Sequence, residues 1–137
     1  MGSTEIQWRV HLASSPEAVY ELLSTDEGRA QFWAESSVER DGAIELAFPN
    51  GWRTQTRLLA AEEPRRFAVD YLGSTTTFEL EPDGDGGTDL TLTAEGDAET
   101  LAGWVSVLLA LKAAADFGID LRNHDPQRSW TQGYCDN

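Results

Sequence analysis

Residues 97–118 read DAETLAGWVSVLLALKAAADFG, and this segment constrains the architecture more than any other. Asp97 is a favourable helix N-cap and Gly118 is a typical helix stop, so we predict one helix between them. Apolar residues recur every three or four positions and give a broad stripe roughly 30 Å long. The positions on the stripe are Leu101, Trp104, Val105, Leu108, Leu111, Lys112 and Ala115. A helix with such a face needs an apolar surface to cover.

The segments before this helix predict an antiparallel sheet that supplies the surface. Residues 5–12 (EIQWRVHL) alternate strictly between apolar and polar side chains, as a half-buried strand does. Six further runs follow between residues 34 and 95, separated by turn signals such as Asp41-Gly42 and Asp83-Gly84-Asp85-Gly86-Gly87. Parallel neighbours would need crossovers of about a dozen residues, so connections this short predict an antiparallel meander.

Two short helices are predicted between the first strand and the rest of the sheet. Ser15 can cap the first, and Pro16 suits its first turn. A second start signal at Thr25 or Asp26 leads to Phe32 and Trp33. The predicted class is therefore α+β, with seven antiparallel strands, two short helices after the first strand, and a long C-terminal helix packed on the sheet.

Composition limits the partners and the location. The 137 residues contain 10 basic and 24 acidic side chains, for a formal net charge of −14. Such a chain repels nucleic acid and anionic membrane surfaces, so neither is an expected partner. Cys135 is the only cysteine, the N-terminus lacks a signal-peptide pattern, and no apolar run approaches the roughly 20 residues of a membrane span. We expect a soluble, cytoplasmic protein, with a domain at 1–118 and an extension at 119–137.

Particular residues resemble the START-like, or Bet v 1-like (SRPBCC), superfamily. Residues 14–23 (SSPEAVYELL) followed by Phe32-Trp33 look like the opening of its bacterial group related to the C-terminal domain of the activator of Hsp90 ATPase. Gly103-Trp104, with Leu108 and Leu111-Lys112, looks like that group's final helix. The resemblance covers about residues 5–117. It implies the helix-grip fold, in which a curved sheet holds the long helix.

The resemblance also implies a cavity between sheet and helix, used in the superfamily for lipids, sterols or polyketides. We expect a small apolar or amphipathic ligand there, bound without a cofactor by a monomer or a homodimer. The candidate ligand-binding residues are Trp33, Phe48, Trp52, Phe67, Tyr71, Phe78, Leu101, Trp104 and Leu108. The alternative for each aromatic is plain core packing, which is the usual role of such side chains.

Two other functions stay open. One is a cyclase- or dehydratase-type enzyme, for which an acid or base would be needed in the cavity. The strand-borne candidates for that role are Glu45, Asp70, Tyr71 and Glu79. The other is a cochaperone-like interaction module, with a filled interior and an exposed apolar patch. No catalytic residue is assigned, because the group shares no catalytic motif.

The polar tail offers a weak metal pattern and two large aromatics. Asp116, Asp120 and His124 are spaced by four, but Gly118 ends the helix between them, so no metal site is expected. Trp130 and Tyr134 are costly to expose. We therefore expect the tail to dock on its own domain, in preference to a second subunit, where it would form a lid if it crossed the cavity mouth.

Overall fold

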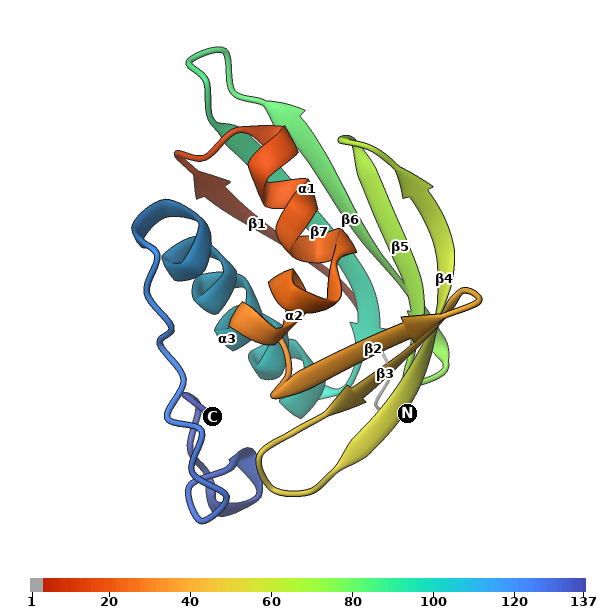
Figure 1. Cartoon of the computed structure of the whole chain (residues 1–137), viewed down its shortest axis with the longest axis vertical. Coiled ribbons are helices and arrows are strands. Elements are labelled where there is room, and N and C mark those ends of the chain that lie inside the picture. Colours follow the sequence, from red (N-terminus) through yellow and green to blue (C-terminus); the bar gives the residue numbers. More distant parts are fainter. Residues whose placement is uncertain (1–3) are drawn as a thin grey trace.

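The computed structural model describes residues 4–137, which form one curved sheet and three helices. The sheet order is β1-β7-β6-β5-β4-β3-β2, and every neighbouring pair is antiparallel (Figure 1). The elements are β1 (Thr4–Leu12), α1 (Pro16–Ser24), α2 (Asp26–Phe32), β2 (Ser36–Arg40), β3 (Ala43–Ala47), β4 (Arg53–Glu62), β5 (Arg66–Tyr71), β6 (Ser74–Pro82), β7 (Thr88–Gly96) and α3 (Ala98–Lys112). The predicted helix-grip architecture is confirmed.

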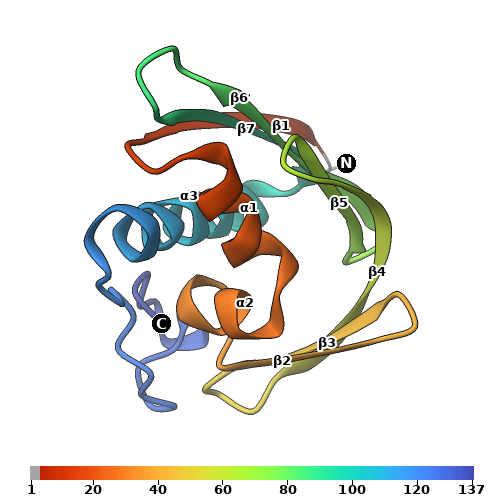
Figure 2. The same ribbon diagram turned by 45° about the horizontal axis from the view of Figure 1, so that its top comes forward.

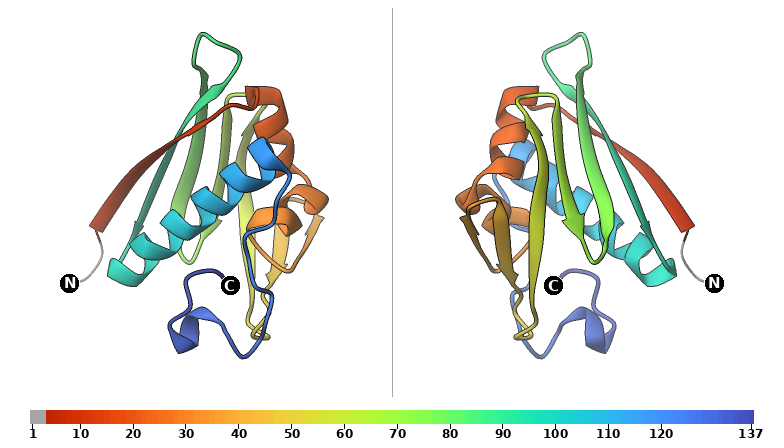
Figure 3. Two further views of the ribbon diagram at one scale, coloured as in Figure 1. Left: turned by 90° about the vertical axis from the view of Figure 1, so that its left-hand side faces the viewer. Right: turned by 90° about the vertical axis from the view of Figure 1, so that its right-hand side faces the viewer.

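The sheet wraps around the helices. Figure 2 shows the strands as an arc from β1 to β2, with α1, α2 and α3 inside the arc. A register shift between Leu58 and Ala60 of β4 helps the sheet to bend, as bulges do. Seen from the side, α3 crosses the open side of the arc diagonally (Figure 3). The concave face is thus the only part of the sheet that the helices cover.

The predicted N-caps begin the helices. The Ser15 hydroxyl accepts a hydrogen bond from the Ala18 amide at 3.2 Å, and the Thr25 hydroxyl accepts one from Gly28 at 2.9 Å. Asp97 accepts from the Thr100 amide at 2.9 Å. Each cap satisfies an N–H group that has no partner within its helix.

The end of the long helix differs from the prediction of one regular helix up to Gly118. α3 ends at Lys112, and residues Ala113–Phe117 form a wider π-helical turn that stops at Gly118, whose φ is 65°. This turn carries the Asp116 carboxylate, which accepts hydrogen bonds from the amides of Ala13 and Ser14 at 2.9 and 3.0 Å. The turn is therefore tied to the loop after β1.

The long helix is less buried than its predicted stripe. Val105, which is on the predicted stripe, is 36% exposed, and Leu109, which is outside it, is 51% exposed, because the sheet covers only one side of α3. By length and composition, residues Ala98–Phe117 match a membrane span, with a mean hydropathy of 1.4. Our expectation that no apolar segment approaches that length was wrong. Core helices of soluble proteins have the same composition, and here Trp104, Leu108 and Leu111 are buried among the core residues of the sheet.

A buried arginine joins α2 to β2, which the sequence did not indicate. Arg29 is fully buried, and its guanidinium donates to the Leu23 carbonyl at 2.8 Å and to the Ser37 hydroxyl at 2.9 Å. It also pairs with Asp26 at 2.8 Å and with Glu39 at 3.0 Å. This network fixes the position of α2, and with it Trp33 at the C-terminal end of α2.

Candidate ligand-binding pocket

The middle of the space between sheet and helices is filled with side chains. Phe67, Phe78 and Leu108 are at most 3% exposed and belong to one continuous core cluster. The accessible space lies at one end of the arc, beside the N-terminal half of α3. It is a pocket of about 470 Å³, with walls from α3, the β3–β4 turn, the β5–β6 turn and the C-terminal tail.

Three rings form what we call the inner aromatic cluster, namely Trp33, Tyr71 and Trp104. Their centroids are 5.5 Å apart for Trp33–Tyr71 and for Tyr71–Trp104, and 5.7 Å apart for Trp33–Trp104. Phe78 lies against two of these rings, at 6.0 Å from Trp33 and 5.9 Å from Trp104. The cluster brings α2, β5 and α3 together and gives the pocket one apolar wall.

Three other rings form the outer aromatic cluster, namely Phe48, Trp52 and Trp130. The centroid distances are 5.1 Å for Phe48–Trp52, 5.4 Å for Phe48–Trp130 and 5.8 Å for Trp52–Trp130. Phe48 and Trp52 flank the β3–β4 turn, where the Phe48 amide donates to the Trp52 carbonyl at 2.9 Å. Trp130 comes from a short 3₁₀ turn of the tail. The tail therefore supplies part of the pocket wall.

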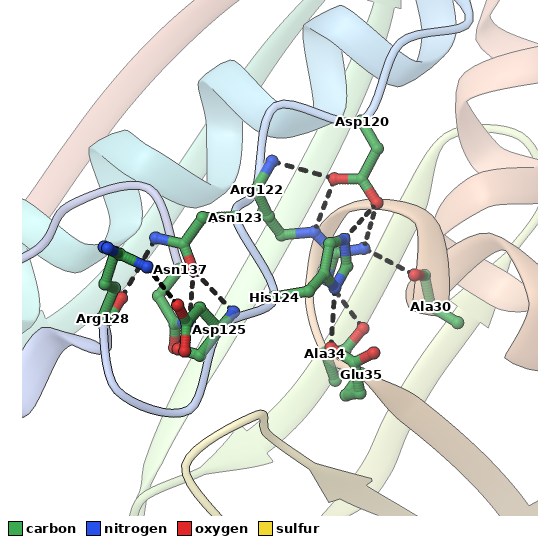
Figure 4. A network of polar contacts seen from close by, with 10 residues as sticks. All are labelled: Ala30, Ala34, Glu35, Asp120, Arg122, Asn123, His124, Asp125, Arg128 and Asn137. Carbon is green, nitrogen blue, oxygen red and sulfur yellow. Dashed lines mark hydrogen bonds and ion pairs between the residues drawn. The ribbon is translucent and has the colours of Figure 1, made fainter.

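Arg122 holds the start of the tail against α2 (Figure 4). Its guanidinium donates to the carbonyls of Ala34 and Ala30 at 2.7 and 2.6 Å, and it pairs with Asp120 at 3.0 Å. These carbonyls belong to the C-terminal end of α2 and the residues after it, where carbonyl groups lack helical partners. Arg122 thus satisfies them and fixes the tail at the same time.

His124 lies between two carboxylates in the same network (Figure 4). Its Nδ1 is 2.7 Å from Glu35 and its Nε2 is 2.7 Å from Asp120. The hydrogen bond to Glu35 has the largest effect and raises the pKa of His124; partial burial acts in the opposite direction, and the hydrogen bond to Asp120 adds to the rise. Although partial burial acts to raise it, hydrogen bonds from Arg122 and His124 lower the pKa of Asp120 to about 2. An imidazolium flanked by two carboxylates is therefore the favoured state.

The last residues fold back on the tail. The Asn137 amide Nδ2 donates to the Asn123 side chain at 3.1 Å and to the Asp125 carbonyl at 3.2 Å. Asn137 Oδ1 is buried and has no hydrogen-bond partner, and Asn137 lines the pocket. Both partners of Nδ2 are acceptors, so the two amide atoms cannot be exchanged. The Oδ1 acceptor is thus unused and has almost no accessible surface.

A second pocket of about 430 Å³ adjoins the first around the N-terminal end of α3. Both pockets are lined by Tyr71, Leu72, Thr100 and Trp104. The second is the more polar, since its other lining residues are Gly73, Ser74, Thr76, Glu95, Gly96 and Asp97. The two pockets thus share four lining residues and differ in polarity.

Two ionisable groups at the pockets have clear pKa shifts. Burial raises the pKa of Tyr71 to about 12, although a hydrogen bond from Trp33 acts in the opposite direction. Hydrogen bonds from the amide and the hydroxyl of Thr100 lower the pKa of Asp97. Near neutral pH, Tyr71 is therefore a neutral donor and Asp97 is a carboxylate already occupied by its own helix. Neither has the properties of a general base.

The nine candidate ligand-binding residues separate into two sets. Those that line the larger pocket are Trp33, Phe48, Trp52, Tyr71 and Trp104. Those that line neither pocket are Phe67, Phe78, Leu101 and Leu108, of which all but the half-buried Leu101 are core residues. Of the acid–base candidates, Glu45, Asp70 and Glu79 are exposed away from the pockets, and only Tyr71 lies at one.

Sequence reasoning missed Trp130 as a wall of the pocket, along with Leu72, Val107 and Tyr134. The only available signal was the pair of large aromatics in a polar tail. The Asp116, Asp120 and His124 pattern is divided, because Asp116 contacts Ser14 whereas His124 contacts Asp120. Within residues 4–137, no group of three or more His, Cys, Asp or Glu side chains has the arrangement of a metal site.

Comparisons with known proteins agree on the family and the fold. The model of the family described as "Polyketide cyclase / dehydrase and lipid transport" matches residues 3–123. Protein SSP2350 from Staphylococcus saprophyticus is 24% identical over 87% of this chain and 96% of its own, with a TM-score of 0.78. The Aha1 dimer from Colwellia psychrerythraea is 20% identical over 84% and 98%, with a TM-score of 0.70.

A third similar structure, DynU16, is a protein in the dynemicin biosynthetic locus. It is 15% identical over 85% of this chain but 48% of its own, with a TM-score of 0.72. No curated protein matches the sequence. At these identities the solved structures establish the shared fold.

Proposed function

Because the chain belongs to the polyketide cyclase, dehydrase and lipid-transport family, we propose that it binds a small apolar or amphipathic molecule in the 470 Å³ pocket. The proposed ligand lies between the inner and the outer aromatic cluster. The extension 119–137 acts as one wall of the site through Trp130, and the domain 1–118 supplies the others.

The observation that carries this proposal is the pocket itself. Its volume falls within the range of about 300–1,000 Å³ that is typical of small-molecule sites. Six aromatic side chains from the two clusters line it, and such walls bury apolar ligand surface at roughly 25 cal/mol per Å². A few polar groups, including the neutral Tyr71 hydroxyl and the Thr100 side chain, are available to orient a ligand.

Binding is favoured over catalysis by the chemistry of these groups. Of the four strand-borne acid–base candidates, only Tyr71 lies at the pocket, and with its pKa raised to about 12 it donates a hydrogen bond and does not accept a proton. A cyclase in which the pocket only folds a reactive substrate is the second candidate, supported by the family match. It predicts turnover of a polyketone chain, which a pure binder lacks.

Two further predictions concern context. The likeness to a protein solved as a dimer supports the expectation of a monomer or a homodimer, which light scattering distinguishes. A cytoplasmic location also stays a prediction, to be checked by fractionating the host's cells.

A neutral probe tests the proposal. We expect 1-naphthalenemethanol to quench tryptophan fluorescence saturably and to raise the melting temperature, because it buries its rings between the clusters. Native mass spectrometry should show one bound probe per chain. Absence of saturable binding by this probe and by a panel of fatty alcohols, sterols and polyketide-like phenols would overturn the proposal.

A further inference from the structure

We infer that the pocket selects a ligand with a positively charged head on an aromatic or apolar body, and that it rejects carboxylates such as fatty acids. This inference rests on the proposed function and names its class of ligand. It follows from the charges at the rim, from the capped end of α3 and from the walls.

All the charged side chains that line the two pockets are acidic. Glu99 lines the larger pocket, and Glu95 and Asp97 line the adjoining one. Among residues 4–137, no Lys, Arg or His side chain lines either pocket. A carboxylate ligand would therefore meet only like charge, whereas an ammonium group would meet opposite charge.

Three arginines on elements that border the larger pocket are paired with carboxylates. Arg122 is bonded to Asp120 and to carbonyls of the α2 end, and Arg128 pairs with Asp125 (Figure 4). On β4, beyond Trp52, Arg53 pairs with Glu45 on the outer face of the sheet. Each of these positive charges is thus already balanced by a neighbouring carboxylate.

The N-terminal end of α3 is closed to anions as well. Such an end normally attracts a negative group, because its amides are unpaired and the helix dipole is positive there. Here the Asp97 carboxylate already accepts from the Thr100 amide at 2.9 Å and from its hydroxyl at 3.0 Å. Glu99 adds a second negative charge in the first turn. The chain's own carboxylates thus take the place of an anionic ligand.

The aromatic walls of the larger pocket suit a cation. Indole faces attract ammonium groups more strongly than other aromatic faces do, and four tryptophans line the larger pocket. They are Trp33, Trp52, Trp104 and Trp130. Aromatic walls and acidic rim groups thus favour the same head group.

Three naphthalene probes of equal ring size test the inference. They are 1-naphthylmethylamine, 1-naphthalenemethanol and 1-naphthoate, which are cationic, neutral and anionic near neutral pH. In fluorescence and calorimetric titrations, we expect the amine to bind about tenfold tighter than the alcohol and the naphthoate about tenfold weaker. Raising the salt concentration should weaken binding of the amine and leave binding of the alcohol unchanged.

A matched pair of variants separates the effect of the local charge on binding from the effect of the overall net charge of −14. Glu99→Gln should lower amine affinity roughly threefold more than it lowers alcohol affinity. Glu81→Gln removes the same charge from an exposed site outside both pockets and should leave all three affinities unchanged. Equal losses in the two variants would overturn the inference, as would equal binding of the three probes or preference for naphthoate. In those cases the alcohol still binds and the proposed function stands; if no probe binds, both fail.

Discussion

Replacing Gly103 with leucine should block the pocket while making the protein more stable. Gly103 lies within α3 and lines the larger pocket, and a Cβ built there has no atom within 4 Å. Glycine in a helix interior costs about 1 kcal/mol relative to alanine, and leucine is almost as good as alanine. The Gly103→Leu variant should therefore gain about 1 kcal/mol, which corresponds to a melting temperature roughly 3 °C higher.

The same side chain enters the space that the probe would occupy. We expect Gly103→Leu to weaken binding of 1-naphthalenemethanol by at least about tenfold, which is 1.4 kcal/mol. Gly103→Ala is the matched control, because it brings the same helix gain with only one methyl group and should weaken binding less than about threefold. Paired urea melts and fluorescence titrations measure both quantities.

The stability and the probe affinity of the Gly103 variants each test the position of the ligand. If Gly103→Leu binds the probe as the wild-type protein does, the ligand lies elsewhere. If this variant is less stable than Gly103→Ala by more than about 1 kcal/mol, the space beside Gly103 is not vacant.

Three further changes test the parts that support the pocket. Arg29→Met leaves Asp26 and Glu39 without their buried partner. The free energy of unfolding measured in urea should therefore fall by about 3 kcal/mol, and a fall of less than about 1 kcal/mol would contradict the role of this network. Arg122→Ala removes the hydrogen bonds to the carbonyls at the end of α2. The rate of amide hydrogen exchange should then rise in residues 123–137 but not in β5–β7, and an unchanged rate in the tail would show that Arg122 does not hold it. Because the folded pKa of His124 is raised, its contribution to stability is complete below its unfolded pKa of about 6.5 and is lost as pH rises through the folded value. Relative to His124→Gln, the wild-type protein should thus lose stability in urea melts between mildly acidic and alkaline pH, and parallel pH profiles would be inconsistent with the bridge.

Much of the fold was predictable because its signals are local. The caps at Ser15, Thr25 and Asp97 each act within three residues, so the sequence alone locates the helix starts. The short turns between β2 and β7 leave only antiparallel pairing, so this part of the sheet follows from loop length, whereas the pairing of β1 with β7 does not. The π-helical turn at Ala113–Phe117 was not predictable, because its contacts are with the loop after β1, far away in the sequence.

The candidate site was predictable only in part, because alternation gives the face of a strand and not the depth of a side chain. Phe78 and Tyr71 both face the helices, yet Phe78 is buried in the core and Tyr71 lines both pockets. Trp130 reaches the β3–β4 turn through a tail in which His124 and Gly133 have φ values of 59° and 91°. A polar sequence does not specify such a path, since many loop conformations satisfy it.

The indole N–H signals of the five tryptophans give the most direct test of a ligand between the two aromatic clusters. Trp33, Trp52, Trp104 and Trp130 line the pocket, whereas Trp8 lies on β1 and lines neither pocket. In NMR titrations with 1-naphthalenemethanol, we expect saturable shifts of the four pocket signals and none of the Trp8 signal. A shift confined to Trp8, or no saturable shift at all, would contradict it.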